Sequence, residues 1–477
     1  MRKVDYAKRS GTKIIATLGP ATCKLGQIER LAEAGANGFR LNFSHGGYDF
    51  VEEVIGHIRN AEKRLGIYLP IMQDLQGPKI RLNNFKKELS IKNGDVVTFG
   101  LCSSPEQYRD KICITYPKLN KEAKKGEKVF IDDGKIELLV KKIFKDKVEF
   151  DVIKGGLLLP RKGVNFPHTC LSIPSMTTKD IKDLEFGSKH QMDYIALSFV
   201  RSPNDLKLLR SLMKKLKYDA CVIPKIEKPE AVLNLEKIID QSDAILLARG
   251  DLGVEVDVEH VPSIQKKVLA LCKTKKVPVI VATHMLESMI TNPLPTRAEV
   301  TDVYQAVQDG TDAVMLSGET AVGKYPVEAV KMMKKIATES ENNISAERRS
   351  VVSISDNVDE AIAVAGRAIT DSINARFICC FTSSGWTAKL LSKTGLKHPV
   401  IAFTNQDKTS RAISLYRGVT AINIKKQLPS IDAMFAVASD ILKKEGLAKK
   451  GDKLVIVAGQ PIGRAGTTNI LKVHSIE

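Results

Sequence analysis

Eight short apolar segments, most of them followed by a stretch with helical periodicity, limit most strongly how this 477-residue chain can fold. They lie at residues 13–17, 38–42, 70–74, 193–199, 221–226, 243–248, 277–282 and 312–316. Runs that are almost entirely apolar suit strands covered on both faces, as in parallel sheets. Eight strand–helix units in succession predict an α/β fold built on a (β/α)₈ barrel, also called a TIM barrel.

Helix start signals support this arrangement. The segment SPND at 202–205 precedes the periodic run LKLLRSLMKKLK, and PTRAE at 295–299 has the form of a helix cap. Serine or threonine before the first turn, with proline or an acidic residue soon after, is typical of a helix N-terminus. We therefore expect helices to begin at both places.

The regular spacing breaks between the third and fourth strands, where the gap is too long for a loop in a compact domain. Short alternating runs at 96–99, 128–131, 135–140 and 147–152, separated by Asn-Gly and Asp-Gly turns, predict an inserted all-β domain. The polar segment ENNISAERRS reads as a linker, and apolar strands at 377–381, 400–403 and 454–458 indicate a C-terminal α/β domain. The expected domains are a discontinuous barrel (1–76 and 173–340), the insert (77–172) and the C-terminal domain (351–477).

The net charge of +18 narrows the possible partners. A basic chain can bind nucleic acid, an acidic membrane surface or small phosphorylated molecules. The positive charge is spread along the chain, without an RNA-binding signature or a basic stripe interleaved with aromatic residues. No apolar run is long enough for a membrane span, the first residues contain no apolar signal core, and the eight cysteines lack metal-ligand spacing. We expect a cytoplasmic chain that binds neither nucleic acid nor membrane.

Polar residues collect where the predicted strands end, which in a barrel of this kind is the face that carries active sites. The segments are RLNFSH at 40–45, DLQGPKIR at 74–81, KIE at 225–227, RGD at 249–251, TH at 283–284 and SGET at 317–320. Each taken alone is readily explained as a helix cap or an ion pair. Their convergence from six strands onto one rim favours a functional site.

The chemistry of this rim suits a phosphorylated anion. Glu227 and Asp251 offer two hard oxygen ligands on neighbouring strands, and such a pair with open positions suits Mg²⁺ or Mn²⁺. Arg40 and Lys225 would bring positive charge to a phosphoryl group. Because phosphoryl transfer depends mainly on cations and alignment, the residues indicate metal-assisted chemistry on a phosphate.

At these residues the sequence closely resembles the pyruvate kinase family. The matching segments include TKIIATLGPAT, RLNFSHG, DLQGPKIR, PKIEKPEA, ARGDLGVE, ATHMLESM, PTRAEVTDV and SGETAVGKYP, and they run in order along nearly the whole chain. The resemblance implies transfer of the phosphoryl group of phosphoenolpyruvate to ADP, giving pyruvate and ATP, the last step of glycolysis. It also implies that the insert is a β-barrel lid and that the C-terminal domain is regulatory.

The resemblance assigns roles to individual residues. Glu227 and Asp251 look like ligands of the divalent metal, Lys225 like the catalytic lysine, and Arg40 like the phosphate-binding arginine. Thr283 matches the threonine near the face where the enolate carbon gains its proton, and the amides of Gly250 and Asp251 would receive the substrate carboxylate. The positions that match the nucleotide site are Thr17, Pro20, His45, Arg81 and Lys162.

One departure from the family pattern concerns K⁺. Many members hold K⁺ with an asparagine, a serine, an aspartate and a threonine carbonyl, beside a motif that ends in glutamate. This chain has Asn42, Ser44 and Asp74, but Leu75 follows, and Lys79 replaces the glutamate. A lysine ammonium in that region would repel K⁺. We therefore expect activity without K⁺, with Lys79 as the built-in cation.

The C-terminal domain carries a candidate loop for a phosphorylated effector, formed by Thr382, Ser383, Ser384, Gly385 and Thr387. Trp386 lies inside this loop, where packing against a neighbouring loop is at least as plausible as stacking on a ligand. The resemblance further implies a homotetramer. Two alternatives remain open from the sequence: another metal-dependent barrel enzyme acting on phosphoenolpyruvate or an oxo acid, such as a lyase, and a basic nucleic-acid-binding protein with a degenerate barrel.

Overall fold

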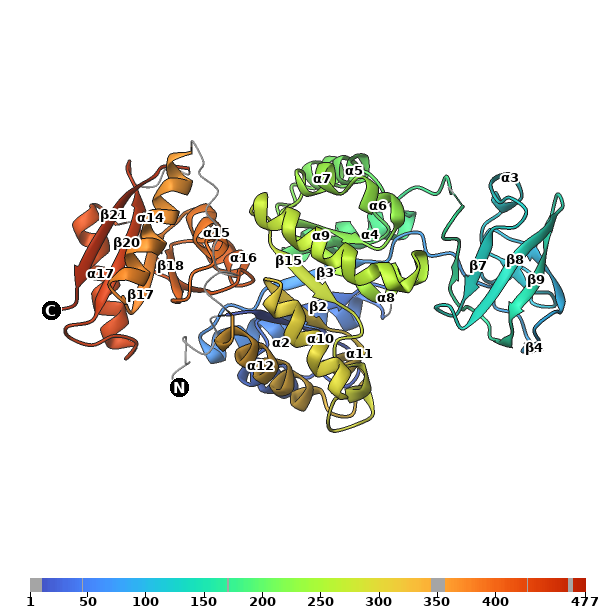
Figure 1. The fold of residues 1–477 in the computed structure, drawn as a ribbon, viewed down its shortest axis with the longest axis horizontal. Coiled ribbons are helices and arrows are strands. Elements are labelled where there is room, and N and C mark those ends of the chain that lie inside the picture. The colour runs from blue at the N-terminus through green and yellow to red at the C-terminus, as the bar shows by residue number, and fades with distance from the viewer. Residues whose placement is uncertain (1–10, 45, 170, 345–356, 427, 462–465) are drawn as a thin grey trace.

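The computed structural model describes residues 11–44, 46–169, 171–344, 357–426, 428–461 and 466–477. Figure 1 shows three bodies in a row, with a barrel in the centre, the β-rich insert on one side and the C-terminal domain on the other. Within the described ranges, no helix combines the length and the apolar character needed to cross a membrane.

The central body is the closed parallel barrel that the eight apolar segments predict. Around the barrel the strands follow the order β1-β16-β15-β14-β13-β12-β3-β2, so each barrel strand pairs with the next barrel strand along the chain, including β3 with β12 across the insert, and β16 closes onto β1. Every residue of β12, β14, β15 and β16 is buried, because helices cover the outside of the barrel and side chains fill its interior. The strands are β1 (Lys13–Leu18), β2 (Gly38–Asn42), β3 (Ile71–Leu75), β12 (Tyr194–Leu197), β13 (Cys221–Ile226), β14 (Ile245–Ala248), β15 (Val279–Ala282) and β16 (Ala313–Leu316).

Three aspartates that the sequence pattern included in strands lie just before them instead. Their carboxylates accept hydrogen bonds from the first amides of the neighbouring strand: Asp193 from Ile71 at 2.8 Å, Asp243 from Val222 at 2.7 Å, and Asp312 from Val279 at 2.8 Å. Asn37, before β2, accepts in the same way from Ile14 in β1 at 2.9 Å. These side chains satisfy backbone donors at the N-terminal face of the barrel.

The helices that surround the barrel begin where their capping signals predict. Helix α5 starts after Ser202, whose amide donates to Asp205 Oδ2 at 2.8 Å in a capping box. Thr296 and Glu299 form the same motif at the start of α10. The remaining long barrel helices are amphipathic or half-buried and pack outside the strands. The long barrel helices are α1 (Leu25–Ala34), α2 (Tyr48–Leu65), α4 (Thr178–His190), α5 (Pro203–Lys215), α9 (Val261–Thr274), α10 (Arg297–Gln308) and α12 (Pro326–Asn342), and the short ones are α6 (Pro229–Leu233), α7 (Leu235–Ile239), α8 (Arg249–Glu255) and α11 (Gly318–Ala321).

The insert leaves the barrel after β3 and returns before α4. It contains a six-stranded sheet in the order β11-β7-β8-β9-β5-β6 and a two-stranded sheet of β10 and β4, with a core of its own that includes Phe99 and Phe150. The four strands expected from alternation are present. Four others of two or three residues are too short to give a periodic signal. The elements are β4 (Leu89–Ile91), β5 (Val96–Leu101), β6 (Cys113–Ile114), α3 (Leu119–Glu122), β7 (Lys128–Ile131), β8 (Ile136–Ile143), β9 (Lys147–Lys154), β10 (Gly156–Leu158) and β11 (Val164–Asn165).

The C-terminal domain is a five-stranded sheet in the order β19-β18-β17-β20-β21, with only β21 antiparallel to its neighbour. Of the expected linker at 341–350, residues 341 and 342 end helix α12, while 345–350 lie outside the described residues. The elements are α14 (Val358–Ser372), β17 (Phe377–Phe381), α15 (Trp386–Lys393), β18 (Val400–Thr404), α16 (Asp407–Ile413), β19 (Val419–Asn423), α17 (Ile431–Lys444), β20 (Lys453–Gly459) and β21 (Thr468–Ser475).

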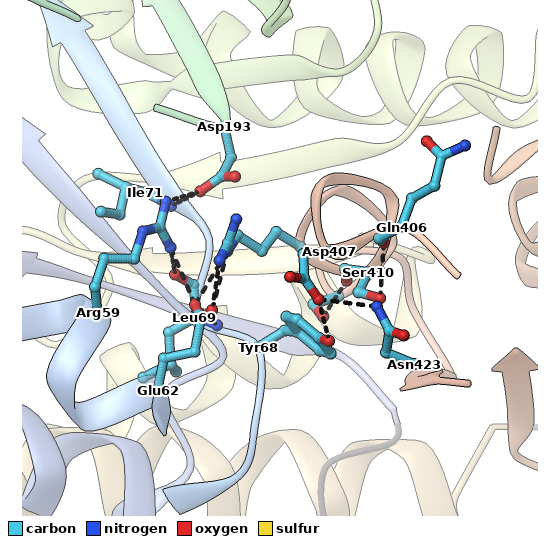
Figure 2. Close-up of polar contacts among 12 residues, drawn as sticks. Arg59, Glu62, Tyr68, Leu69, Ile71, Asp193, Gln406, Asp407, Ser410 and Asn423 are labelled. Carbon is cyan, nitrogen blue, oxygen red and sulfur yellow. Dashed lines mark hydrogen bonds and ion pairs between the residues drawn. The ribbon is translucent and has the colours of Figure 1, made fainter. Parts of the chain in front are cut away.

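A buried polar network joins this domain to the N-terminal face of the barrel (Figure 2). Arg411 of α16 donates to Glu62 Oε1 of α2 from Nη2 at 2.7 Å and from Nε at 3.1 Å. Glu62 also accepts from Arg59 at 3.0 Å and from the amide of Leu69 at 3.1 Å, and Arg59 continues to Asp193 at 2.9 Å. The network therefore runs from the C-terminal domain to the residue that caps β3.

We expect Arg411→Met to lower the thermal midpoint of unfolding by about 2–6 °C, because Glu62 would lose a two-point charged partner while remaining mostly buried. Scanning calorimetry of the full chain measures the shift. Arg64→Met is the matched control, since Arg64 is mostly exposed and pairs with Glu29 at 3.4 Å, so its loss should have little effect. Equal shifts in the two variants would contradict a stabilising role for the Arg411 contact.

Candidate active site

Lys225, near the end of β13, is the most enclosed cation at the C-terminal end of the barrel. Its Nζ lies 2.8 Å from Glu227 Oε1 and 3.5 Å from Asp74 Oδ2, and it donates to Ser198 Oγ at 3.0 Å. Burial opposes the charged form, but the attraction of Asp74, Glu227 and Asp251 outweighs it and raises the pKa of Lys225 above its ordinary value. The ammonium therefore stays charged at neutral pH.

Asp74, in β3, holds two cations at once. Its Oδ2 accepts from Arg40 Nε at 2.7 Å, lies 2.6 Å from Arg40 Nη2, and lies 3.5 Å from Lys225 Nζ. Burial works against the Asp74 carboxylate, but the attraction of Lys225 and Arg40 outweighs it and lowers the pKa of this carboxyl. Arg40 and Lys225 are thus brought together from strands β2 and β13.

Glu227 and Asp251 are the carboxylates on the other side of the Lys225 cluster at the C-terminal end of the barrel. Glu227 Oε2 accepts from the Phe199 amide at 2.9 Å, while Oε1 faces Lys225. Burial raises the pKa of Glu227, and repulsion by Asp251 in the first turn of α8 (Arg249–Glu255) adds to this against the attraction of Lys225. A buried carboxylate beside a half-buried one that repels it suits a divalent cation. Among the described residues no group of three metal-ligating side chains forms, so the other ligands of such an ion would come from substrate and water.

Thr283 follows β15 with a φ of 68°, which is strained backbone for a β-branched residue. Its hydroxyl donates to the Ala282 carbonyl at 2.6 Å and accepts from the Gly250 amide, also at 2.6 Å. A side chain on Gly250 would come within 3.2 Å of this hydroxyl. The Gly250 amide, expected to face a substrate carboxylate, is therefore bonded to Thr283 here.

The expected nucleotide residues divide between two bodies. Thr17 is buried, donates to the Leu316 carbonyl at 2.8 Å and accepts from Arg40 at 3.1 Å, so it belongs to the central cluster. Arg81 and Lys162 lie in the insert. Arg81 forms an isolated antiparallel β-bridge with Gly163, and the Lys162 ammonium forms an ion pair with Asp132 at 2.8 Å. Of the others, Pro20 is exposed beyond β1, and His45 lies outside the described residues.

The expected monovalent-cation residues are only partly assembled. The Asn42 side-chain oxygen accepts from the Ser44 amide at 3.0 Å, and the Leu75 carbonyl accepts from Ser198 at 2.7 Å. Lys79 lies beside Gly163 of the insert. A side chain on Gly163 would come within 3.1 Å of Lys79 Cε, and Lys79 lines the crevice between insert and barrel together with Glu255.

Sequence reasoning did not single out Ser198. This serine directly follows β12, contacts Lys225, and lies 3.4 Å from Asp74 Oδ1. The available signal was its position in the segment SFVRS, at the end of a predicted strand.

The candidate effector loop borders a cavity of about 220 Å³ in the C-terminal domain, lined by Thr382, Ser383, Ser384, Trp386 and Thr387 among others. Gly385 has a φ of 87° and donates to the Thr382 hydroxyl at 2.9 Å. The Trp386 indole donates to Asp359 of α14 at 3.0 Å, so one edge of the ring is engaged within the domain.

Comparison with known proteins agrees with this geometry. Residues 9–330 match the family described as pyruvate kinase, barrel domain, and residues 360–474 match pyruvate kinase, alpha/beta domain. The chain belongs to the pyruvate kinase family. It is accordingly a kinase of the class that uses phosphoenolpyruvate and ADP.

Individual relatives extend over nearly the whole chain. Pyruvate kinase 2 of Synechocystis is 42% identical across 98% of this chain and 79% of its own length, and a pyruvate kinase of Staphylococcus aureus is 40% identical across 98% and 80%. The crystal structure of a pyruvate kinase from Cryptosporidium parvum superposes with a TM-score of 0.91 at 32% identity, covering 99% of this chain and 98% of that one.

We expect Asp74→Asn to destabilise the protein by about 3–5 kcal/mol near neutral pH, because Arg40 and Lys225 would lose their shared counter-ion. The pKa of Asp74 is lowered in the folded state, so its stabilising contribution is present above the unfolded pKa of about 3.9 and is lost as pH falls through the folded value. The difference in thermal midpoint between wild type and variant should be constant from about pH 5 to 8 and shrink below about pH 4.

The control is Asp110→Asn, which removes an exposed carboxylate that pairs with Lys86 at 3.0 Å. Its midpoint should stay close to wild type at every pH. A stability difference for Asp74→Asn that grows on acidification would contradict the assigned direction of the pKa.

Proposed function

We propose that the chamber at the C-terminal end of the barrel transfers the phosphoryl group of phosphoenolpyruvate to ADP, with Lys225 and Arg40 as the protein cations at the transferring group. The main support for this proposal is that Arg40 and Lys225 both form ion pairs with the buried Asp74 carboxylate. The bond between phosphorus and the enol oxygen breaks, a new bond forms to a β-phosphate oxygen of ADP, and the enolate carbon takes a proton to give pyruvate. Fixed positive charge stabilises the charge that spreads over the phosphoryl oxygens and the enolate.

Thr283 and Gly250 would act on the other end of the substrate. The Thr283 hydroxyl is proposed to orient the water that delivers the proton to the enolate carbon. The amides of Gly250 and Asp251 would receive the substrate carboxylate, which requires the Thr283 hydroxyl to release the Gly250 amide when substrate binds. Substrate binding and proton delivery are therefore coupled through one hydrogen bond.

We propose that Glu227 and Asp251 hold Mg²⁺ or Mn²⁺. The burial of Glu227 and the repulsion between the two carboxylates fit a divalent cation that keeps open positions for substrate and water. Such an ion, when bound, would neutralise charge on substrate oxygens. Lys225 would then give up part of its contact with Glu227 and turn toward the phosphoryl group.

The nucleotide would lie between the barrel rim and the insert. Thr17 and Pro20 would approach it from the barrel, and Arg81 and Lys162 from the insert; His45, the remaining expected nucleotide residue, lies outside the described residues. We propose that the insert closes as a lid over bound ADP, which would exclude water from the reaction.

We also propose that the protein is a cytoplasmic homotetramer and that a phosphorylated effector binds the hydroxyl-rich loop 382–387. The proposed domain boundaries lie at 76/77, 172/173 and 340/351. The hydroxyl-lined cavity beside that loop supports the effector proposal.

A direct test measures pyruvate formed from phosphoenolpyruvate with and without ADP. We expect turnover to require ADP, whereas a lyase would not. Lys225→Met should lower kcat by about 10²–10³-fold or more with a smaller change in KM for phosphoenolpyruvate, because the lost charge acts on the transition state.

Lys237→Met is the matched control, since Lys237 is exposed on α7 (Leu235–Ile239), the second short helix after β13 in the chain. It should leave both kinetic constants unchanged. ADP-independent release of pyruvate, or full activity of Lys225→Met, would refute the proposal.

We propose that K⁺ is not required, with Lys79 as the resident cation. Lys79 lines the crevice between barrel and insert, where its ammonium would supply the positive charge that K⁺ provides in other members. Wild-type activity should persist when tetramethylammonium replaces K⁺, whereas Lys79→Glu should be active only with K⁺, because a carboxylate would restore attraction for the ion.

Lys86→Glu makes the same charge change on an exposed lysine of the insert and should not create K⁺ dependence. A large loss of wild-type activity without K⁺ would overturn this proposal while leaving the phosphotransfer proposal intact.

A further inference from the structure

The turn that follows β15 contains two consecutive residues in the left-handed region of backbone space. Thr283 has a φ of 68° and His284 a φ of 53°. Residues other than glycine rarely adopt this conformation, and for a β-branched residue such as Thr283 it is strained, so it persists only where surrounding contacts enforce it. The contacts of this turn therefore decide where the Thr283 hydroxyl lies.

Arg249, the first residue of α8, holds this turn from one side. Its Nη2 donates to the Thr283 carbonyl at 3.2 Å and to the His284 carbonyl at 3.4 Å, and it lies 2.8 Å from Met285 Sδ. One guanidinium nitrogen thus contacts three successive residues. Because two successive carbonyl groups are directed to the same donor, the contact favours the left-handed backbone at Thr283 and His284.

Asp302 of α10 anchors the same guanidinium. Its Oδ1 lies 2.6 Å from Arg249 Nη1, and the Arg249 side chain is only 10% exposed. A short charged contact to a planar guanidinium restrains the orientation of the whole group. The guanidinium is therefore oriented by α10 at one terminal nitrogen and holds the turn with the other.

The start of α8 also packs directly against the turn. The Gly250 amide donates to Thr283 Oγ1 at 2.6 Å, and a side chain on Gly250 would come within 3.2 Å of both Thr283 Oγ1 and His284 Cε1. Arg249 immediately precedes Gly250 in the chain. Its side chain therefore connects the segment proposed to receive the substrate carboxylate with the segment proposed to deliver the proton.

We propose that Arg249 is a positioning residue for proton delivery to the enolate carbon. It holds the turn 283–284 against α8, so that the Thr283 hydroxyl keeps its place beside the Gly250 amide. Arg249 acts through Thr283 and not on the substrate, because its two terminal nitrogens are engaged by the turn and by Asp302. This inference rests on the role proposed above for Thr283, and it assigns Arg249 to the protonation step.

A double-mutant cycle on proton exchange tests this role. NMR of pyruvate in D₂O, with Mg²⁺, ATP and the full-length protein, follows exchange of the methyl protons: a proton leaves the methyl carbon of bound pyruvate and a deuteron replaces it. We expect Arg249→Met to slow this exchange by about 10–100-fold, because the turn is no longer held in place. In the Thr283→Ala background the same substitution should slow exchange by less than about threefold, since the hydroxyl that Arg249 positions is absent.

Arg64→Met is the matched control, because it makes the same substitution at a mostly exposed arginine that pairs with Glu29 at 3.4 Å. It should exchange pyruvate protons like wild type. Asp302→Asn is a second, milder variant, which removes the charged anchor and leaves Arg249 in place. It should slow exchange by about fivefold, and only where Thr283 is present, so it carries the same comparison if Arg249→Met does not fold.

The inference is overturned if Arg249→Met, or Asp302→Asn in its place, slows exchange by the same factor with and without Thr283, since a merely structural role would act in both backgrounds. It is also overturned if these variants or Thr283→Ala exchange protons like wild type. Failure of the wild-type protein to form pyruvate in the presence of ADP would instead refute the phosphotransfer proposal.

Discussion

The charged end of the barrel depends on the buried carboxylate of Asp74. Arg40 and Lys225 come from strands on either side of β3 and would repel each other in a setting of low dielectric. Asp74, only 2% exposed, lies within ion-pair distance of both. Ser198 adds a neutral link, because it contacts both Lys225 and the carbonyl of Leu75. Strands β2, β3, β12 and β13 are thus fixed relative to one another by the same groups that are proposed to bind the substrate.

The two ends of the barrel use polar residues differently. At the N-terminal face, Asn37, Asp193, Asp243 and Asp312 accept amides of neighbouring strands, and Glu62 joins the C-terminal domain. These side chains therefore use their hydrogen bonds to hold parts of the fold together. At the C-terminal face Arg40, Asp74, Lys225 and Glu227 are paired chiefly with one another, and we propose that they exchange those partners for substrate. The polar residues of the N-terminal face therefore contribute to stability, whereas those of the C-terminal face contribute both to stability and to the proposed chemistry.

Some elements of the structure are predictable from the sequence and others are not, depending on the physical property that each sequence pattern reflects. The eight barrel strands were predictable because strands buried on both faces are almost entirely apolar. Strand β19, which includes Thr420 and Asn423, and the half-exposed edge strand β21 were missed because their patterns are weaker. The clustering of Arg40, Asp74, Lys225 and Glu227 was predictable from their positions, since the ends of parallel strands meet on one rim. Two features were not predictable from the sequence: the hydrogen bond between Thr283 and the Gly250 amide, and the position of Lys79 beside Gly163. Both depend on packing between segments that are distant in the chain.

The insert has a consequence for how the chain folds. Strands β3 and β12 pair directly, with Met72 beside Tyr194, yet the whole insert lies between them in the sequence. Closing so long a flexible loop would cost conformational entropy and slow the search for the correct pairing. The insert has its own hydrophobic core, so it can become compact first and bring its two ends close together. With the ends of the insert already close together, β3 and β12 could pair without closing a long flexible loop. The insert would therefore fold before the barrel closes.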